Sequence, residues 1–289
     1  FGGILARRGN PEDNHHLSEY SIPLLDLVIV DLYPFEETVR KSNDNEEIIE
    51  KIDIGGISLI RAGAKNYNDV LVVSCREQYQ GLLSLLKTGK GVTTLEERKS
   101  YAATAFRVSS GYDTAIFKYL NGGNETGFFR ESIDGSYPLR YGENPHQKGI
   151  YYGDPGLIFE KLHGKEISYN NFLDIDAAIS LIDEFDDITF AIFKHNNACG
   201  VASRKNQADA WRDALASDPV SAFGGVIATN TIVDGTSASE IDKLFFEIII
   251  APGFTDDALK TLMQKKNRII LRRNKTQSLK TSFRSVLNG

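Results

Sequence analysis

The chain alternates short apolar runs with longer segments of helical periodicity. Continuous apolar runs of this length are typical of strands that are buried on both faces of a sheet. The clearest strand patterns lie at 23–32, 69–74, 188–193, 226–229 and 268–271. Helical patterns lie at 45–54, 58–64, 78–86, 94–106, 112–120, 172–185, 208–215 and 256–264. This alternation predicts an α/β protein whose amino-terminal part has a parallel sheet covered by helices.

Residues Asn121 to Gly135 are rich in Gly, Asn, Glu and Ser and read as a linker. A length of 289 residues fits about two domains. We therefore expect one domain over 1–121, a linker over 122–138 and a second domain over 139–289. Because the chain starts without methionine and stops within a pattern, we also expect it to be an internal piece of a longer protein.

The composition is that of an ordinary globular protein, with 41% hydrophobic and 25% charged residues. A net charge of −6 argues against nucleic-acid binding, and no apolar run or signal-peptide pattern indicates a membrane protein. The basic excess from Lys265 to Arg284 is either a solvated face or an attraction for an anionic substrate. Two distant cysteines, Cys75 and Cys199, exclude a disulfide framework and favour a reducing compartment, so we expect a cytoplasmic protein.

Candidate chemistry is concentrated where the apolar run 188–193 changes into Lys194-His195-Asn196-Asn197. In open α/β sheets ligands bind outside the carboxyl ends of the strands, so a lysine and a histidine there are well placed for catalysis. The alternative interpretation is that Lys194 is solvated and His195 lies in a turn. From these residues alone the two interpretations are equally good.

Two other segments combine polar side chains with glycine or proline. The stretch Leu139 to Gln147 carries Arg, Tyr, Asn, His and Gln, and its arginine suits phosphate through a bidentate fork. Gly55 and Gly56 separate two helical patterns and leave backbone N–H groups open to an anion, or else simply break the helix.

Several known catalytic motifs are missing from the sequence. A zinc deaminase needs a His-x-Glu segment and a Pro-Cys-x-x-Cys segment, whereas Cys199 stands alone after His195. There is also no P-loop, no Gly-x-Gly-x-x-Gly and no nucleophile elbow. The remaining clusters of Arg, Lys, His, Asn, Tyr and Asp suit phosphate and ribose binding and proton transfer, without a metal.

Taken together, these segments closely resemble the bifunctional AICAR transformylase/IMP cyclohydrolase family of purine biosynthesis. The resemblance rests on the segments at 2–8, 31–35, 52–56, 61–66, 139–147, 165–171, 194–200 and 217–225, in family order over nearly the whole chain. It implies a partial methylglyoxal-synthase-like parallel-sheet domain, followed by a cytidine-deaminase-like α/β domain without zinc.

For the amino-terminal domain, the resemblance implies closure of the FAICAR ring to give IMP with loss of water. It assigns catalysis to Tyr33, Asp53 and Lys65, and we expect Gly55 and Gly56 to contact the substrate. Ring closure places an amide nitrogen on a formyl carbon, which requires proton transfer and stabilisation of a developing oxyanion.

For the second domain, the resemblance implies formyl transfer from the cosubstrate 10-formyltetrahydrofolate to AICAR, with no metal. His195 would act as the general base on the weakly nucleophilic amine, and Lys194 would stabilise the tetrahedral intermediate. The residues implied to hold the nucleotide are Arg140, Tyr141, His146, Asn171, Phe223, Gly224 and Glu247.

The resemblance also implies a homodimer, with AICAR, FAICAR and IMP as the nucleotides bound. Because family segments at both ends are absent from this chain, we expect the chain by itself to be inactive in both reactions. The alternative is a non-catalytic nucleotide-binding or dimerisation module. Such a module would be expected to lose some of Tyr33, Asp53, Lys65, Lys194 and His195, and all five are present.

Overall fold

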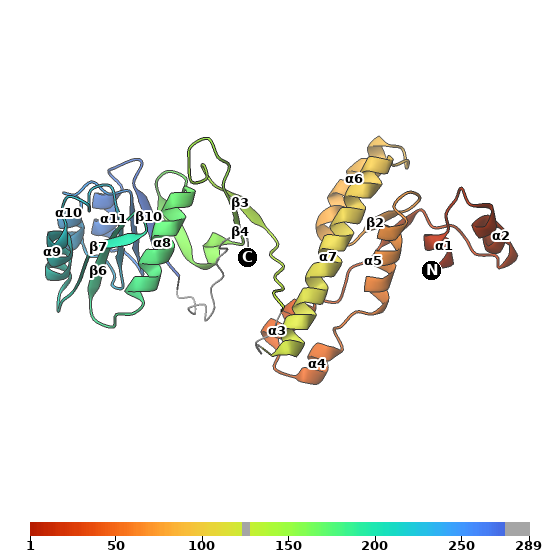
Figure 1. Ribbon diagram of the computed structural model, residues 1–289, viewed down its shortest axis with the longest axis horizontal. Coiled ribbons are helices and arrows are strands. Elements are labelled where there is room, and N and C mark those ends of the chain that lie inside the picture. Colours follow the sequence, from red (N-terminus) through yellow and green to blue (C-terminus); the bar gives the residue numbers. More distant parts are fainter. Residues whose placement is uncertain (123–127, 275–289) are drawn as a thin grey trace. The chain divides into compact units, whose positions relative to one another are not determined.

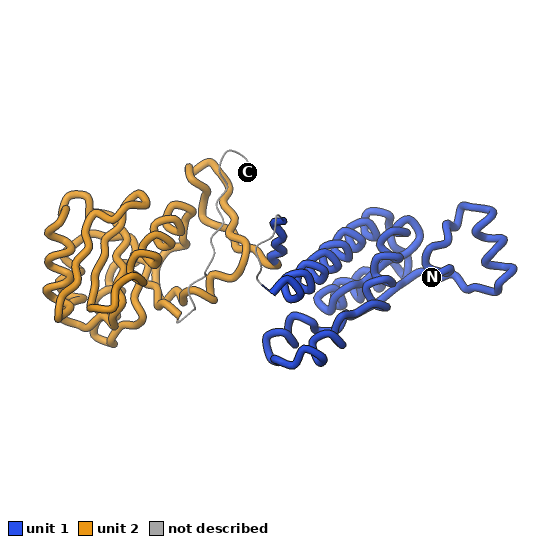
Figure 2. Tube along the Cα trace, turned by 60° about the horizontal axis from the view of Figure 1, so that its bottom comes forward, with its two compact units in different colours: residues 1–133 blue, residues 134–289 orange. Residues whose placement is uncertain are grey.

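The computed structural model describes residues 1–122 and 128–274. It divides into two compact units, Phe1–Ile133 and Asp134–Gly289, shown in separate colours in Figure 2. Each unit has its own sheet and its own apolar core.

Unit 1 is predominantly helical and carries a short sheet (Figure 1). Its elements are α1 Gly2–Leu5, α2 Pro11–Glu19, β1 Leu27–Ile29, α3 Phe35–Lys41, α4 Asn45–Ile49, α5 Gly55–Lys65, β2 Leu71–Val73, η1 Arg76–Gln78, α6 Tyr79–Thr88 and α7 Leu95–Asn121. Strands β1 and β2 pair in parallel, as the alternation of strand and helix patterns along the sequence predicts.

The core of unit 1 lies on both sides of β2. Val70 and Val72 pack with α5 and α7, whereas Leu71 and Val73 pack with Leu82 of α6. Helix α5 approaches the sheet closely because Gly63 has no side chain: a Cβ there would lie 3.2 Å from the Cβ of Val72.

The prediction of a buried strand over 23–32 is only partly correct. A strand forms only at Leu27–Ile29, and of its three residues Val28 alone is buried. Leu27 and Ile29 are 36% and 47% exposed. β1 has β2 as its single partner in the described sheet, and helix α6, which covers the neighbouring Leu71 and Val73, leaves Leu27 and Ile29 largely exposed.

The separate helices predicted at 94–106 and 112–120 form one helix, α7. Its start is as predicted: Thr94 accepts the N–H of Glu97, and Glu97 accepts the N–H of Thr94. Glycine within a helix costs about 1 kcal/mol, yet α7 continues through Gly111 because buried residues on both sides of it, among them Ala105 and Tyr112, fix the helix against the core.

Up to Asn274, the last residue that the structure describes, unit 2 is a six-stranded sheet with helices on both faces (Figure 1) and a separate small hairpin. Its elements are β3 Ser136–Pro138, β4 Ile150–Tyr152, η2 Pro155–Leu157, β5 Phe159–His163, α8 Tyr169–Ile182, β6 Thr189–Lys194, β7 Asn197–Ser203, α9 Gln207–Ser217, β8 Val226–Thr229, α10 Gly235–Ile241, β9 Ile248–Ala251, α11 Asp256–Leu262 and β10 Ile269–Arg273. The strand order of the large sheet is β5-β10-β9-β8-β6-β7.

Alternate residues of the central strands enter two different cores. In β6, Phe190 and Ile192 pack against α9, α10 and α11, whereas Ala191 and Phe193 pack against α8. The same alternation in β8, β9 and β10 explains why these strands are continuously apolar: both faces of the sheet are covered. The α/β class predicted from the sequence is confirmed as a mixed sheet, parallel through β8, β9 and β10.

The prediction that Lys194 and His195 lie at a ligand site assumed that their strand belongs to an open parallel sheet. β6 does not run in the direction of such a sheet. β6 runs antiparallel to both β7 and β8. Its carboxyl end therefore lies beside Val226 and Ile248, the amino ends of β8 and β9. The reason is the two-residue turn His195-Asn196, which returns the chain directly into β7, a strand that the apolar pattern does not reveal.

Part of the predicted linker 122–138 is ordered. Ser136–Pro138 forms β3 and pairs antiparallel with β4. Residues 123–127 of the linker, and the basic segment beyond Asn274, lie outside the described residues. Among the described helices, none is both long and apolar enough to cross a membrane.

Candidate functional site

Lys194 and His195 lie at the end of β6 and in the turn that follows it. His195 and Asn196 form the turn, with φ angles of 54° and 63°, and Lys194 pairs with Asn197 across the hairpin. Left-handed φ angles at two successive non-glycine residues are uncommon, although His and Asn tolerate them better than most. His195 therefore lies in a turn, as the alternative interpretation expects, and it is exposed to solvent next to Lys194, which is only partly exposed.

The ammonium group of Lys194 is held by the segment that precedes β8. Its Nζ donates to the carbonyl of Phe223 at 2.7 Å. Gly224 follows with a φ of 76°, and its N–H donates to the carbonyl of Phe245 at 2.7 Å. Phe223 is 58% exposed, and its ring centroid lies 5.0 Å from that of Phe245. The hairpin thus shares a surface with two exposed aromatic rings.

A small cavity adjoins this surface. It measures about 420 Å³ and is lined by Lys194, His195, Asn197, Ala198, Cys199, Val220 and Ser221. The Sγ atom of Cys199 donates to the carbonyl of Ile192 at 3.4 Å, at the bulge that the register shift creates in the hairpin. Burial raises the pKa of the Cys199 thiol, so this group is poorly suited to act as a nucleophile.

Asp174 approaches the same turn from α8. Its Oδ1 atom accepts the backbone N–H of Asn196 at 2.6 Å. Burial raises the pKa of the Asp174 carboxyl, and the nearby Glu247 raises it further, while the Asn196 N–H and His195 act in the opposite direction. The carboxylate is therefore within electrostatic range of both His195 and Glu247.

Glu247 links the beginning of α8 to the beginning of β9. Lys165 Nζ lies 2.9 Å from Glu247 Oε2, and Asn171 Nδ2 lies 3.5 Å from the same oxygen. Asn171 is oriented by a capping box, in which the Asn171 N–H donates to Ser168 Oγ and the Ser168 N–H donates to Asn171 Oδ1, and Ser168 Oγ also donates to Asn171 Oδ1 at 2.9 Å. A carboxylate, an ammonium group and an amide are thus gathered at one point.

Arg140 and Tyr141 lie next to this group. The guanidinium of Arg140 lies 4.5 Å from the centroid of the Tyr141 ring, and its Nη2 donates to the Tyr141 hydroxyl at 2.7 Å. Tyr169 N–H donates to the Tyr141 carbonyl at 3.3 Å, which joins this loop to the start of α8. Arg140 lowers the pKa of the Tyr141 phenol, with a smaller contribution in the same direction from Ser168.

The structure thus brings most of the residues predicted for the second domain to one end of the sheet. They are Lys194, His195, Phe223, Gly224, Asn171, Glu247, Arg140 and Tyr141. His146 differs: it is exposed in a turn that Gln147 closes by accepting the N–H of Asn144, and within the described chain it makes no hydrogen bond to the others.

The residues predicted for the first domain are less closely grouped. Tyr33 is 56% exposed, with Lys51 Nζ 5.9 Å from its ring centroid. Asp53 is buried, and its Oδ1 accepts the N–H of Gly56 at 2.5 Å, so this carboxylate caps the first turn of α5. The N–H of Gly56 that was expected to face a ligand is therefore occupied, while Gly55 is exposed.

Lys65 lies in the last turn of α5, at the opposite end from Asp53. A rise of 1.5 Å per residue separates the two ends of this helix by about 15 Å. Lys65 and Asp53 therefore cannot act on the same proton, and a ligand that touches both must extend along the helix.

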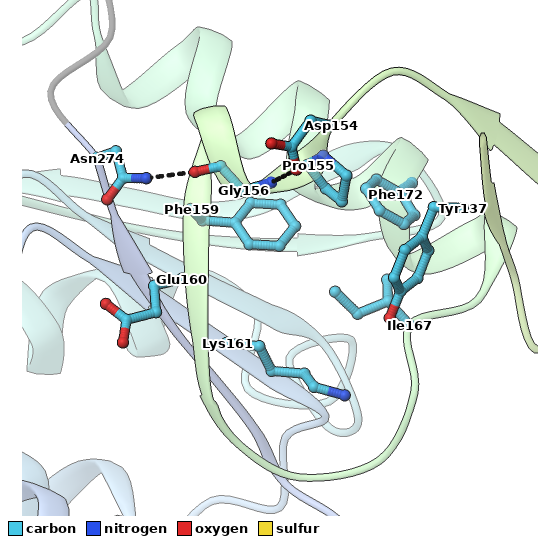
Figure 3. Close-up of a pocket in the computed structure, with 10 residues that line it drawn as sticks. All are labelled: Tyr137, Asp154, Pro155, Gly156, Phe159, Glu160, Lys161, Ile167, Phe172 and Asn274. Atoms are coloured by element: carbon cyan, nitrogen blue, oxygen red, sulfur yellow. Dashed lines mark hydrogen bonds between the residues drawn. The ribbon is translucent and has the colours of Figure 1, made fainter. Parts of the chain in front are cut away.

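A second cavity, of about 490 Å³, lies elsewhere in unit 2 (Figure 3). It is lined by Tyr137, Asp154, Pro155, Gly156, Phe159, Glu160, Lys161, Ile167, Phe172 and Asn274. Its polar groups are already paired: Lys161 Nζ lies 2.6 Å from Glu166, and Asn274 donates to the Gly156 carbonyl at 2.7 Å. The larger cavity therefore offers fewer available reactive groups than the surface at Lys194 and His195.

No group of three or more His, Cys, Asp or Glu side chains in 1–122 or 128–274 is arranged to hold a metal ion. The hairpin surface instead combines an exposed imidazole with a cation, and next to them a carboxylate, an amide and an arginine. Such a set can accept a proton, stabilise an oxyanion and bind a phosphorylated sugar.

Asp174 and Lys165 also belong to this group, and neither was predicted from the sequence as a site residue. The helical pattern at 172–185 was assigned no functional residue, yet Asp174 follows Asn171 by three residues and so lies on the same face of the helix. That spacing was an available signal. No sequence feature indicated that Lys165 pairs with Glu247, 82 residues away.

Comparisons with known proteins agree with the sequence resemblance. The family model described as "AICARFT/IMPCHase bienzyme" matches residues 63–289. The bifunctional purine biosynthesis protein PurH of Bacteroides thetaiotaomicron is 58% identical over 289 residues, 100% of this chain and 57% of the relative. The proteins of the same name from Acetivibrio thermocellus and Persephonella marina are 47% and 45% identical, covering 92% and 93% of this chain and 54% and 55% of the relatives. The chain thus spans about half the length of the curated relatives that it matches.

Proposed function

The chain belongs to the AICARFT/IMPCHase bienzyme family, and from this premise we propose that the protein works in purine biosynthesis. It transfers a formyl group from 10-formyltetrahydrofolate to AICAR and closes the resulting FAICAR to IMP. The single observation that best supports this is the exposed His195 next to Lys194, at the same end of the sheet as Glu247, Asn171 and the Arg140–Tyr141 pair.

In formyl transfer, the amine of AICAR attacks the formyl carbon and a new C–N bond forms. The lone pair of this amine is conjugated with the imidazole carboxamide, so a base must take its proton during the attack, and His195 is placed to do so. The tetrahedral intermediate carries negative charge on the former carbonyl oxygen. The Lys194 ammonium stabilises it. The bond to the folate nitrogen then breaks, and that nitrogen leaves as an amine with the proton that His195 took from AICAR.

The nucleotide is held by the groups around Glu247. Arg140 presents a guanidinium fork to the phosphate, the geometry that favours arginine at such sites. Glu247 and Asn171 supply an acceptor and a donor for ribose hydroxyls, and Phe223 supplies an exposed apolar surface for the base. We also assign Gly224 and His146 to the residues that hold the nucleotide.

Cyclisation is assigned to unit 1. The carboxamide nitrogen of FAICAR attacks its formyl carbon, the ring closes, and water leaves. Tyr33, Asp53 and Lys65 carry the proton transfers, with Gly55 and Gly56 near the substrate. Because Asp53 caps α5 and Lys65 lies at the far end of that helix, the two residues act on different parts of the nucleotide.

The proposal also covers the fold type of each unit, the cellular location and the oligomeric state of the protein. Unit 1 is part of a methylglyoxal-synthase-like domain, and unit 2 is part of a cytidine-deaminase-like domain that works without zinc. The protein acts as a cytoplasmic homodimer.

The test is formyl transfer by this chain extended to the length of its curated relatives. A His195→Ala variant is expected to lose at least about 100-fold in kcat, the size of effect that a general base contributes. His15→Ala, an exposed histidine on α2, serves as the control and should keep full activity. If both variants are equally active, His195 is not the base. We expect no activity from the 289-residue chain alone.

A further inference from the structure

The turn that carries His195 has an unfavourable backbone. Two-residue hairpin turns with both φ angles positive favour Asn-Gly or Asp-Gly, because glycine at the second position has no Cβ. Here the second position is Asn196, with a φ of 63°. A turn of this kind persists only where surrounding contacts fix it, and such turns cluster at functional sites.

The surrounding contacts come from three directions. Lys194 donates to the Phe223 carbonyl at 2.7 Å, and Asn197 Nδ2 donates to the carbonyl of His195 at 2.9 Å. The third is Asp174, whose Oδ1 accepts the Asn196 N–H at 2.6 Å. This last contact joins the turn to α8, a helix buried along Ile175, Ala178 and Ile182.

From this geometry we propose that Asp174 is a positioning residue, which fixes the imidazole of His195 through the backbone of the turn and faces it with a negative charge. The inference rests on the proposed function, in which His195 is the base. A carboxylate close to the imidazole stabilises the imidazolium that forms when His195 takes the proton of the amine.

A purely structural explanation accounts less well for an aspartate at this position. Burial and the nearby Glu247 both disfavour its charged form and raise the pKa of Asp174. A neutral residue would avoid this cost to folding. An aspartate that costs stability while contacting a catalytic turn is typical of a group retained for activity.

The test uses the chain extended to the relatives' length, with two substitutions of Asp174. Asp174→Ala removes both the acceptor and the charge, whereas Asp174→Asn keeps an acceptor oxygen. The expected loss in kcat is about 10–100-fold for Ala, the range that a misplaced catalytic group produces, with a smaller loss for Asn. KM for AICAR should change less than about threefold, because Asp174 acts through His195 and not on the nucleotide. Asp176→Asn, exposed on the same helix, is the matched control.

A double-mutant cycle shows whether Asp174 acts through His195. In a His195→Ala background, Asp174→Ala should cost little further activity, because coupled residues are not additive. Full additivity overturns the proposal, as does a wild-type kcat for Asp174→Ala. If Asp174→Ala unfolds the protein, Asp174 is a structural residue and the proposal is equally overturned.

Hydrogen exchange provides a readout that does not depend on activity. The peptide containing 194–197 should exchange faster in Asp174→Ala than in the wild type, and unchanged exchange contradicts the proposal. If the wild-type protein transfers no formyl group, the proposed function fails, and the exchange result still decides whether Asp174 holds the turn.

Discussion

Lys165 and Glu247 form an ion pair across 82 residues of sequence, with Nζ 2.9 Å from Oε2. The pair joins the segment before α8 to the amino end of β9, and Asn171 donates to the same carboxylate oxygen. Glu247 is therefore fixed in orientation while its side chain stays 35% exposed. A carboxylate held in this way is suited to bind the hydroxyl groups of a ribose.

Glu247→Gln should weaken nucleotide binding more than it slows the reaction. Hydrogen bonds to charged groups are worth about 1.5–3 kcal/mol, so KM for AICAR should rise about 10-fold or more while kcat changes little. Steady-state kinetics of the chain extended to its relatives' length would show this. Glu240→Gln is the control, since Glu240 pairs with Lys243 at the exposed end of α10. An unchanged KM would mean that Glu247 only joins α8 to β9.

Substitution by alanine should affect the stability of unit 1 differently at the two adjacent glycines that begin α5. At Gly56 a Cβ would lie 2.7 and 2.8 Å from the two carboxylate oxygens of Asp53, so Gly56→Ala should displace this cap and destabilise unit 1 by about 1 kcal/mol or more. A Cβ at Gly55 meets no atom within 4 Å, so Gly55→Ala should be neutral or slightly stabilising.

Chemical denaturation followed by circular dichroism would compare the two glycine variants. The single tryptophan, Trp211, is buried in unit 2, so its fluorescence should be the same in both. Equal stability of Gly56→Ala and Gly55→Ala would mean that Asp53 can move without losing its contact.

Asp174 should make unit 2 less stable as the pH rises. Because burial raises its pKa in the folded state above the ordinary value of 3.8, the unfolded chain releases this proton first. The contribution of Asp174 to the free energy of unfolding is therefore fully present below about pH 4, and it declines as the pH rises through the raised pKa. Asn at this position does not ionise, so the stability of Asp174→Asn relative to the wild type should increase from pH 4 towards pH 7.

The unfolding of unit 2 can be followed at each pH by the fluorescence of Trp211. The quantity to compare is how the difference in unfolding free energy between Asp174→Asn and the wild type changes with pH. Any change in the strength of the hydrogen bond from Asn196 shifts this difference by a similar amount at every pH. A difference that is flat from pH 4 to pH 7, or that falls, would contradict the effect of burial on Asp174.

The two cysteines should be alkylated slowly near neutral pH, but only one should be protected by substrate. Burial raises the pKa of both thiols, which keeps the reactive thiolate scarce. Cys199 lines the cavity beside Lys194 and His195, whereas Cys75 lies in unit 1. In the protein extended to its relatives' length, AICAR or the folate should slow iodoacetamide labelling of Cys199 and leave Cys75 unchanged. Equal labelling of Cys199 with and without both ligands, read by mass spectrometry, would place the substrates elsewhere.

Much of the local structure follows from short-range physical chemistry that the sequence displays. Thr94 and Glu97 form their capping box as predicted, because both partners lie within one helical turn. The apolar run 188–193 forms most of β6, Thr189–Lys194, which is buried on both faces because each of its apolar side chains needs a covered environment. The residues of the Lys194–His195 segment are adjacent in sequence, so their proximity required no tertiary information.

The tertiary structure decided which distant segments meet these residues. Phe223 and Glu247 precede β8 and β9, and they lie at the same end of the sheet as Lys194 only because β6 runs opposite to those strands. A parallel β6 would place Lys194 at the other end of β8, about 13 Å away at the rise of a strand. Strand direction depends on which partners complete the hydrogen bonds and cover both faces of the sheet. That choice involves residues dozens of positions apart, so periodicity along the chain does not reveal it.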